Sequence, residues 1–276
     1  FSCAGVGCYG FKQEGYSCIA SVELEERRLQ IQKYNNKCKY ETGYISGDIK
    51  LDSTKNAVFD EIKRWIRQEK INGVDVIIST PPCQGISDSN HKKRPDEINR
   101  NSRVGESMEL VDKIRPKVFV FENVKAFMKT LCVTKDERVL PIMEYIREAL
   151  GDNYVISGNV LNFMYYGANS SRTRTLVIGV DKKYRDVISP LDLFPDYQEE
   201  KTLAQVVGHL PSLEWGEISD DDFYHAFRTY DIKMLAGIHD LKPGECAFDQ
   251  DDPLTRPHQV QNGTIIEIVQ TNRDKY

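Results

Sequence analysis

The sequence lacks features that would place it outside the ordinary globular proteins. It has no apolar run near the roughly 18 residues that a membrane-spanning helix needs, and we expect no signal peptide. Hydrophobic residues make up 40% of the 276 residues and charged residues 29%, which excludes wholesale disorder. The sequence therefore predicts one large domain, or one large and one small domain, without a membrane partner.

Paired cysteine motifs are also lacking. The seven cysteines are irregularly spaced and include no Cys-x-x-C, which argues against both a disulfide framework and a zinc site. We therefore expect no bound metal, a reducing compartment and a cytoplasmic location.

Positive charge is scarce for a protein that handles nucleic acid. Lys and Arg number 37 against 42 Asp and Glu, a net charge of -5, which by itself argues against a nucleic-acid binder. Residues 1–150 carry a small excess of basic side chains and residues 151–276 a clear excess of acidic ones. This asymmetry suggests two regions with different tasks, or a chain that misses a basic piece. The sequence has no initiator methionine and opens in a glycine-rich segment, so we expect part of a longer protein.

What the sequence does contain is an alternation of strand-like and helix-like segments over its first 180 residues. This order predicts βαβ units, an α/β fold and a largely parallel sheet, with ligands bound beyond the carboxyl ends of the strands. Prolines at 190, 195 and 211 then break the pattern, so we expect one domain over 1–190 and a smaller, irregular region over 191–276. The expected strands are 17–23, 74–78, 118–121, 154–161 and 175–180, and the expected helices are 25–34, 58–69 and 140–150.

A glycine-rich turn and an acid suggest a nucleotide-like cofactor. Glycines at 5, 7 and 10 open the first helix and permit close approach of a ligand to the backbone. Glu23 ends the next strand, where a carboxylate can accept hydrogen bonds from ribose hydroxyls. Asp48 follows a further strand and could accept from an adenine amino group, although aspartate is also common in plain turns. NAD and S-adenosylmethionine both remain possible.

The segment Pro81-Pro82-Cys83-Gln84 directly follows the strand 74–78. Two prolines stiffen this turn and fix the direction in which Cys83 points. Most cysteines are small buried hydrophobic residues, but this one is positioned at the edge of the sheet where ligands bind. Cys83 is therefore a candidate nucleophile.

Glu122 and two arginines stand at the ends of later strands. Glu122 follows four apolar residues, which predicts partial burial, a raised pKa and a capacity for proton donation. Alternation places Arg172 and Arg174 on one face of a strand. A charged strand edge would explain the arginines equally well, but converging on Cys83 and Glu122 they would form a site for an anion or a carbonyl.

Together these motifs resemble those of the bacterial DNA (cytosine-5)-methyltransferases of restriction–modification systems. The resemblance covers residues 1–180 in the order of the family, and residues 202–216 resemble the segment that follows. The chain departs from the family at Cys3 and Val6, which replace glycines, and at Asn169-Ser170, which replaces Pro-Gln. The closing motifs of the family do not occur before Tyr276, and the strand that should lead into Phe1 is absent.

The resemblance implies a Rossmann-like catalytic domain that uses S-adenosylmethionine, followed by the start of a target-recognition region. It implies that Cys83 adds covalently to carbon 6 of a flipped-out cytosine in double-stranded DNA, so that carbon 5 can accept the methyl group. Glu122 would hydrogen-bond ring nitrogen 3, while Arg174 and Arg172 would contact oxygen 2. The residues implied to bind the cofactor are Phe1, Ser2, Cys3, Ala4, Gly5, Val6, Glu23, Leu24, Asp48, Ile49 and Pro82.

The polar segment after Cys83 would close over DNA and contact its phosphates. The candidate nucleic-acid-binding residues are Gln84, Ser87, Lys92, Lys93, Arg94 and Arg103. The resemblance further implies a monomer that acts on nucleoid DNA, with a cognate restriction endonuclease acting separately.

Three other functions remain open at this point. A branch of the family with the same motifs methylates tRNA. A nicotinamide-dependent oxidoreductase would use Gly5, Gly7, Gly10 and Glu23 but would leave Pro-Pro-Cys-Gln and Glu-Asn-Val unexplained. A catalytically silent DNA-binding relative is disfavoured because Cys83, Glu122 and Arg174 are all present.

Overall fold

The computed structural model describes residues 1–82, 101–222, 224–242, 244–252 and 254–267. The chain divides into two compact units, Phe1–Thr202 and Leu203–Tyr276. The 3-10 helix Pro190–Leu193 packs on the last two strands of the first unit, so this unit extends past the expected boundary at residue 190.

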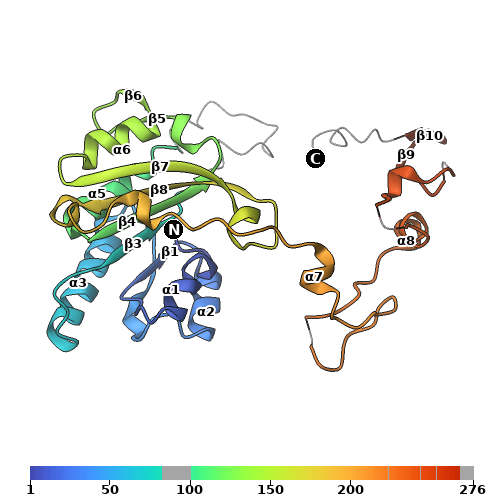
Figure 1. The fold of residues 1–276 in the computed structure, drawn as a ribbon, viewed down its shortest axis with the longest axis horizontal. Helices are drawn as coiled ribbons and strands as arrows, with labels where there is room; N and C mark the ends of the chain where they lie inside the picture. Colours follow the sequence, from blue (N-terminus) through green and yellow to red (C-terminus); the bar gives the residue numbers. More distant parts are fainter. Residues whose placement is uncertain (83–100, 223, 243, 253, 268–276) are drawn as a thin grey trace. The chain divides into compact units, whose positions relative to one another are not determined.

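A four-stranded sheet forms the centre of the first unit (Figure 1). Its strand order is β3-β4-β8-β7, in which β3 (Val76–Ser79) and β4 (Val118–Val124) run parallel. Strands β7 (Tyr154–Asn162) and β8 (Thr173–Asp181) form an antiparallel pair, and β8 is also antiparallel to β4. The predicted α/β, Rossmann-like fold is confirmed, with parallel pairing in the first half of the unit and antiparallel pairing in the second.

Helices α5 (Val104–Ile114) and α6 (Ile142–Leu150) pack against one face of this sheet in a shared hydrophobic core. Phe119 of β4 is fully buried and lies 4.8 Å from Phe121 and 5.1 Å from Tyr154, measured between ring centroids. Gly179 of β8 lies against the Phe119 ring, so that a Cβ at this position would come within 2.0 Å of a ring carbon. Apolar burial on this face fixes the two central strands whose ends carry Glu122 and Arg174.

A second, two-stranded parallel sheet holds the N-terminal part of the unit. Strand β1 (Ser21–Glu23) pairs with β2 (Tyr44–Ser46); helix α2 (Glu26–Tyr34) packs on both strands and α3 (Asp52–Gln68) on β2.

Helix α3 covers most of the helix expected at 58–69 and begins earlier. Its residues Val58 and Trp65 are buried, whereas Ile66 is 43% exposed. The buried stripe instead includes Glu61, whose carboxylate accepts a hydrogen bond from the Trp65 indole at 3.2 Å. A buried acid can replace an aliphatic residue in such a stripe because its charge is paired.

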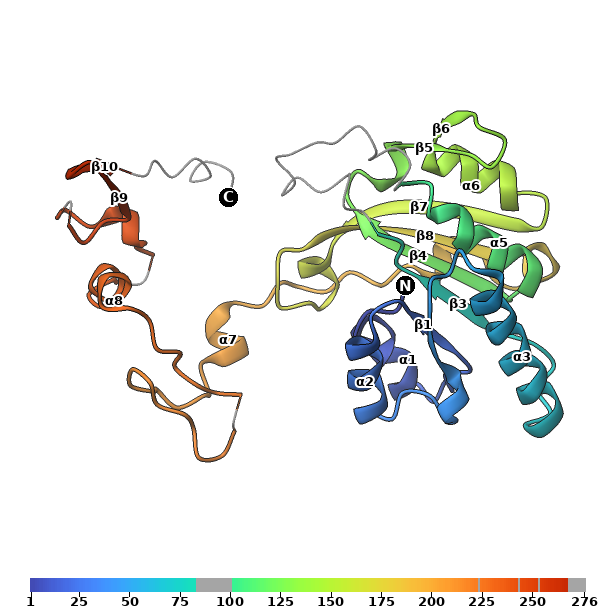
Figure 2. The same cartoon turned by 180° about the vertical axis from the view of Figure 1, so that it is seen from behind.

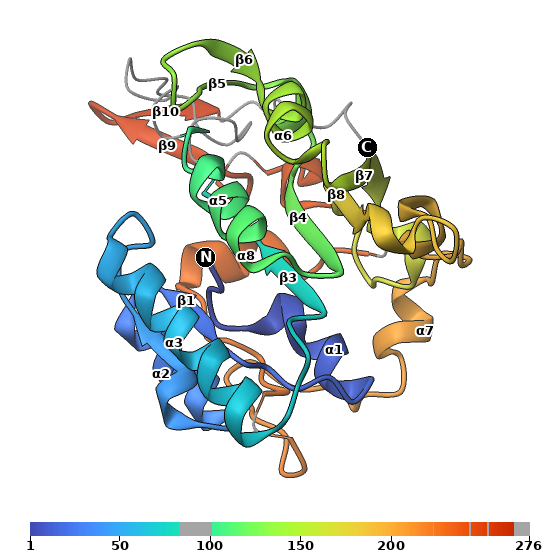
Figure 3. The same ribbon diagram turned by 90° about the vertical axis from the view of Figure 1, so that its left-hand side faces the viewer.

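Phe1 lies between the two sheets (Figure 3). Its backbone nitrogen donates to the Val22 carbonyl of β1 at 3.0 Å, and its carbonyl accepts from the Thr80 hydroxyl, just past β3, at 3.0 Å. The first residues therefore connect the ends of β1 and β3.

The remaining elements of the first unit are short. A hairpin of β5 (Leu131–Val133) and β6 (Val139–Pro141) lies beside α6 (Figure 2). Two hydrogen bonds join β5 to the residues that precede α5. The Asn101 amide donates to the Leu131 carbonyl, and the Val133 nitrogen donates to the Ser102 hydroxyl. These bonds hold the start of α5 against the hairpin. These elements are α1 (Tyr9–Gln13), β5 (Leu131–Val133), β6 (Val139–Pro141) and the 3-10 helices Val6–Cys8, Glu41–Gly43, Phe127–Lys129, Phe163–Tyr166 and Lys182–Tyr184.

The second unit contains little regular structure. Its elements are α7 (Leu203–Val207), α8 (Ile232–Ile238), the 3-10 helix Ala247–Asp249 and an antiparallel pair of β9 (His258–Gln261) and β10 (Thr264–Glu267). Within the described ranges of the chain, none of the helices combines the length and apolar character required to cross a bilayer.

Candidate active site

Strand β4 presents its side chains alternately to the core and to the site. Phe119, Phe121 and Asn123 are buried on one face, and Glu122 therefore points away from that core. Glu122 is only partly buried, with 30% of its side chain exposed. The predicted placement of a half-buried acid at the end of this strand is confirmed.

Arg174 pairs with Glu122 across the antiparallel ladder. Its Nε lies 3.2 Å from Glu122 Oε1, and its side chain is 20% exposed. Burial raises the pKa of Glu122, and the charges of Arg174 and Arg172 offset only part of that rise. Arg172 is exposed and acts on the carboxyl through its charge rather than through an ion pair.

Asn123 ties the end of β4 to the turn that leaves β3. Its side-chain amide donates to the Pro81 carbonyl at 2.8 Å, while its Oδ1 accepts from the Val124 nitrogen at 2.9 Å. Asn123 is 4% exposed, and its bond to the Pro81 carbonyl is buried. The backbone two residues before Cys83 is thus held against the strand that carries Glu122.

Cys83 lies outside the described residues, as do the candidate DNA-binding residues Gln84, Ser87, Lys92, Lys93 and Arg94. Arg103, the last of that predicted group, precedes α5 and is half-buried. It lines a cavity of about 320 Å³ that Lys50, Lys135 and Glu106 also line.

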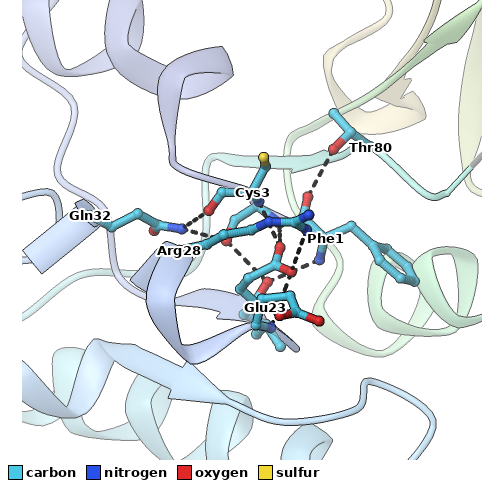
Figure 4. Close-up of polar contacts among 9 residues, drawn as sticks. Phe1, Cys3, Glu23, Arg28, Gln32 and Thr80 are labelled. Atoms are coloured by element: carbon cyan, nitrogen blue, oxygen red, sulfur yellow. Dashed lines mark hydrogen bonds and ion pairs between the residues drawn. The ribbon is translucent and has the colours of Figure 1, made fainter. Parts of the chain in front are cut away.

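Glu23, at the end of β1, lies at the centre of a second group of polar contacts, distinct from the Glu122–Arg174 pair (Figure 4). Its Oε2 accepts from the backbone nitrogens of Ser2 at 3.2 Å and Cys3 at 2.7 Å. Its Oε1 accepts from Arg28 at 3.2 Å and from the Glu25 nitrogen at 3.4 Å. The carboxylate is buried, with 6% of the residue exposed.

The charge state of Glu23 is decided by these hydrogen bonds. Burial by itself would raise the pKa of the carboxyl, but hydrogen bonds from the Cys3 and Glu25 backbone and the nearby Arg28 charge outweigh it and leave the pKa below its ordinary value. Glu23 therefore stays ionised at neutral pH.

The second predicted acid of this region lies close to Glu23. The Gly47 nitrogen donates to the Glu23 backbone carbonyl at 3.1 Å, and this bond joins the ends of β1 and β2. Asp48 is the next residue in the chain. Asp48 Oδ1 accepts from the Lys50 nitrogen at 3.0 Å, the turn geometry that the sequence also allowed.

The other predicted cofactor-binding residues differ in their exposure. Leu24 is 59% exposed, whereas Ile49 is buried. Ala4 and Pro82 are half-buried, and Val6 is exposed.

The sequence reasoning overlooked four supporting residues: Asn123, Thr80, Arg28 and Gln32. Alternation along β4 could have revealed Asn123, because it shares the buried face of Phe119 and Phe121. Thr80 and Gln32 act through contacts with Phe1, Ser2 and Cys3, which lie far away in the chain, so the sequence carries no local signal for them. Arg28 lies only five residues after Glu23, at the start of the following helix.

Comparison with known proteins agrees with this geometry. The family of C-5 cytosine-specific DNA methylases matches residues 1–240. The type II methyltransferase M1.HphI of Haemophilus parahaemolyticus is 30% identical over 277 residues, covering 100% of this chain and 67% of its own length. The type II methyltransferase M1.HgaI of Avibacterium volantium is 26% identical over 253 residues, covering 90% of this chain and 66% of its own length.

A solved structure shows the same fold. It is described as a DNA modification methyltransferase encoded within a prophage of E. coli; it is 23% identical, has a TM-score of 0.50, and covers 73% of this chain and 51% of its own. The chain spans about half to two thirds of the length of the curated relatives that it matches. The order of the strand-end motifs, their geometry and these matches lead to one conclusion: the chain belongs to the C-5 cytosine-specific DNA methylase family.

Proposed function

We propose that this protein transfers a methyl group from S-adenosylmethionine to carbon 5 of cytosine in double-stranded DNA. The observation that carries the proposal is the Glu122–Arg174 pair, held next to the turn that leads to Cys83 in a chain of this family. Family membership also argues against the nicotinamide-dependent oxidoreductase.

Glu122 is suited to hold a proton against the pyrimidine ring. Its raised pKa favours the protonated carboxyl, which can donate to ring nitrogen 3. A hydrogen bond to this nitrogen draws electrons from the ring and assists addition of a nucleophile at carbon 6.

Arg174 is suited to bind the neighbouring carbonyl. Its Nε is engaged by Glu122, and a guanidinium carries five N–H donors in a planar fork, so further donors can reach oxygen 2 of the same ring. Arg172, two residues before Arg174 in the chain, adds positive charge at the edge of the site.

Cys83 is the proposed nucleophile. Addition of its thiolate to carbon 6 makes carbon 5 electron-rich enough to accept a methyl group, and later loss of the carbon 5 proton releases the thiolate. The Asn123–Pro81 hydrogen bond supports this role because it fixes the backbone that leads into Cys83. The target base must leave the duplex for these groups to reach it.

The donor set around Glu23 fits an adenosine cofactor, which, when bound, supplies the electrophilic methyl group. The ionised, buried carboxylate of Glu23 offers acceptors to ribose hydroxyls, and the exposed Leu24 beside it offers an apolar side chain to adenine. Asp48 lies next to these residues, where it can accept from the adenine amino group. The proposed cofactor-binding residues are Phe1, Ser2, Cys3, Ala4, Gly5, Val6, Glu23, Leu24, Asp48, Ile49 and Pro82.

The remaining roles concern the surroundings of the reaction. Gln84, Ser87, Lys92, Lys93, Arg94 and Arg103 contact DNA in this proposal, and residues 191–276 begin the target-recognition region. The protein acts as a monomer on bacterial DNA, alongside a separate restriction endonuclease.

The test is methyl transfer from isotope-labelled S-adenosylmethionine to duplex DNA and, in parallel, to tRNA, with the nucleosides identified by mass spectrometry. The proposal expects labelled 5-methylcytosine in DNA that disappears in Cys83→Ala. Label in tRNA alone would favour the RNA alternative, and label in neither would contradict the proposal.

A further inference from the structure

The turn that approaches Glu23 is built around one side chain of helix α2, Gln32 (Figure 4). Gln32 is 0% exposed although it is polar. Its Nε2 donates to the Ser2 hydroxyl at 2.9 Å and also to the Cys3 carbonyl, and its Oε1 accepts from the Ser21 hydroxyl at 2.5 Å. Both N–H donors and the oxygen of the amide are thus engaged, as a fully buried amide requires.

The backbone of the turn adopts a conformation that its sequence does not favour. Cys3 has a φ of 48°, a left-handed value that costs a non-glycine residue about 1–2 kcal/mol. The hydrogen bond from Gln32 to the Cys3 carbonyl is one of the contacts that hold this conformation. At Gly5, with φ 85°, an added Cβ would come within 3.1 Å of Gln32 Cγ, so the chain wraps closely around this side chain.

The consequence of this conformation appears at Glu23. With the turn so held, the Ser2 and Cys3 nitrogens both point at Glu23 Oε2. The hydrogen bond from the Cys3 nitrogen is also among the causes that lower the pKa of the carboxyl. A different path of residues 2–5 would withdraw these two donors and leave a buried carboxylate without them.

Ser21 and Lys37 fix the orientation of the Gln32 side-chain amide. Ser21 donates to Gln32 Oε1, and the Ser21 hydroxyl itself accepts from Lys37 Nζ at 3.0 Å. Since Lys37 can only donate, the Ser21 hydroxyl must give its own proton to the amide oxygen. The amide nitrogen is therefore turned towards Ser2 and Cys3.

From this network we infer that Gln32 is a positioning residue for the cofactor: it shapes the turn of residues 2–5 and thereby the carboxylate that binds the ribose hydroxyls. The inference rests on the proposed function and deepens it. Gln32 itself does not touch the cofactor in this account, because it is enclosed behind the turn.

The decisive variant is Gln32→Glu, which keeps the shape and the acceptor for Ser21 but loses both N–H donors and places a carboxylate against the Cys3 carbonyl. We expect the Kd for S-adenosylmethionine, measured by calorimetry, to rise at least about tenfold, the equivalent of about 1.4 kcal/mol. We expect kcat at saturating cofactor and KM for DNA to stay within about threefold. A merely structural role would lower the melting temperature and the active fraction but would leave the Kd of the folded fraction unchanged.

Gln30→Glu is the matched control, since Gln30 is an exposed residue of the same helix and undergoes the same chemical change. Its Kd should match that of the wild type. If Gln32→Glu fails to fold, Ser21→Ala provides the second test: it removes only the donor that orients the amide, and the Kd should rise about threefold. A Kd within twofold of the wild type in a folded Gln32→Glu or Ser21→Ala protein would overturn the inference and leave the proposed function intact. Absence of cofactor binding by the wild-type protein would instead contradict the proposed function.

Discussion

The pKa values of two strand-end carboxylates of the same unit, Glu23 and Glu122, are shifted in opposite directions by their surroundings. Glu23, at the end of β1, is the more deeply buried of the two, yet its pKa is lowered because backbone N–H groups and Arg28 point at it. Glu122, at the end of β4, is more exposed, yet its pKa is raised because its arginine neighbours compensate for only part of its burial. Burial alone therefore does not predict the protonation of an acid; the number and direction of its donors decide it. In the proposed function, Glu23 accepts hydrogen bonds from a cofactor and Glu122 donates one to a base.

The largest expected effect comes from Glu122→Gln, which keeps a hydrogen-bond donor but cannot exchange a proton. We expect kcat to fall about 1000-fold, within the range for loss of a general acid, while the Kd for S-adenosylmethionine stays unchanged. Glu144→Gln, at an exposed position of α6, should behave as wild type in both measurements. A Kd that rises with the loss of kcat would show that the two acids do not have separate tasks.

Arg174→Met tests whether the arginine restrains the pKa of Glu122. Removal of its charge should raise that pKa further, because this charge is the largest that lowers it. A group that must be protonated loses activity as the pH rises through its pKa, so the alkaline fall of kcat should move to higher pH. We also expect kcat itself to drop about 100-fold through loss of the contact to the base. An alkaline limb that moves to lower pH would contradict this account of the pair.

Glu23→Gln probes the other acid. The amide cannot accept from Ser2, Cys3 and a ribose at once, so we expect the Kd for S-adenosylmethionine to rise about 30-fold, or about 2 kcal/mol. Because the proposed function places the chemistry at Glu122, kcat at saturating cofactor should change by less than about threefold. Glu26→Gln on the exposed surface of α2 is the control, and a kcat loss that matches that of Glu122→Gln would refute the division of tasks.

A third acid sharpens the comparison because its environment serves stability rather than catalysis. Glu109 of α5 pairs with Lys113 at 2.7 Å, Lys135 at 2.6 Å and buried Lys55 at 2.9 Å, and these lysines lower its pKa strongly. A lowered pKa in the folded state stabilises the protein above the unfolded pKa of about 4.3, and this stability is lost as the pH falls below that value. We expect Glu109→Gln to reduce the free energy of unfolding by about 1.5 kcal/mol at pH 7.

The measurement is urea unfolding at pH 7 and at pH 3. The difference between Glu109→Gln and wild type should shrink at the lower pH, whereas a constant difference would mean that the lysines do not act through the charge of Glu109. Methyl transfer at pH 7 should be unaffected.

The positions of the strand-end residues could be predicted because they follow from local pattern. An apolar run such as Val118–Phe121 predicts both the strand and the half-buried acid after it, and the ends of parallel strands meet at one edge. The antiparallel pairing of β7 and β8 could not be foreseen in the same way, since alternation marks a strand but not its direction. Nor could Gln32, because its partners Ser2 and Cys3 lie about 30 residues away in the chain and no period links them to it.

The measurement that tests the central claim most directly is covalent capture of the protein on duplex DNA that contains 5-fluorocytosine. Fluorine at carbon 5 cannot leave as a proton does, so the bond from Cys83 to carbon 6 should persist after methyl transfer. The account predicts a protein–DNA species, stable to denaturation and dependent on S-adenosylmethionine, whose cross-linked peptide contains Cys83, and its loss in Cys83→Ala. A wild-type protein that methylates cytosine without forming this species, or a Cys83→Ala variant that still forms it, would contradict the account.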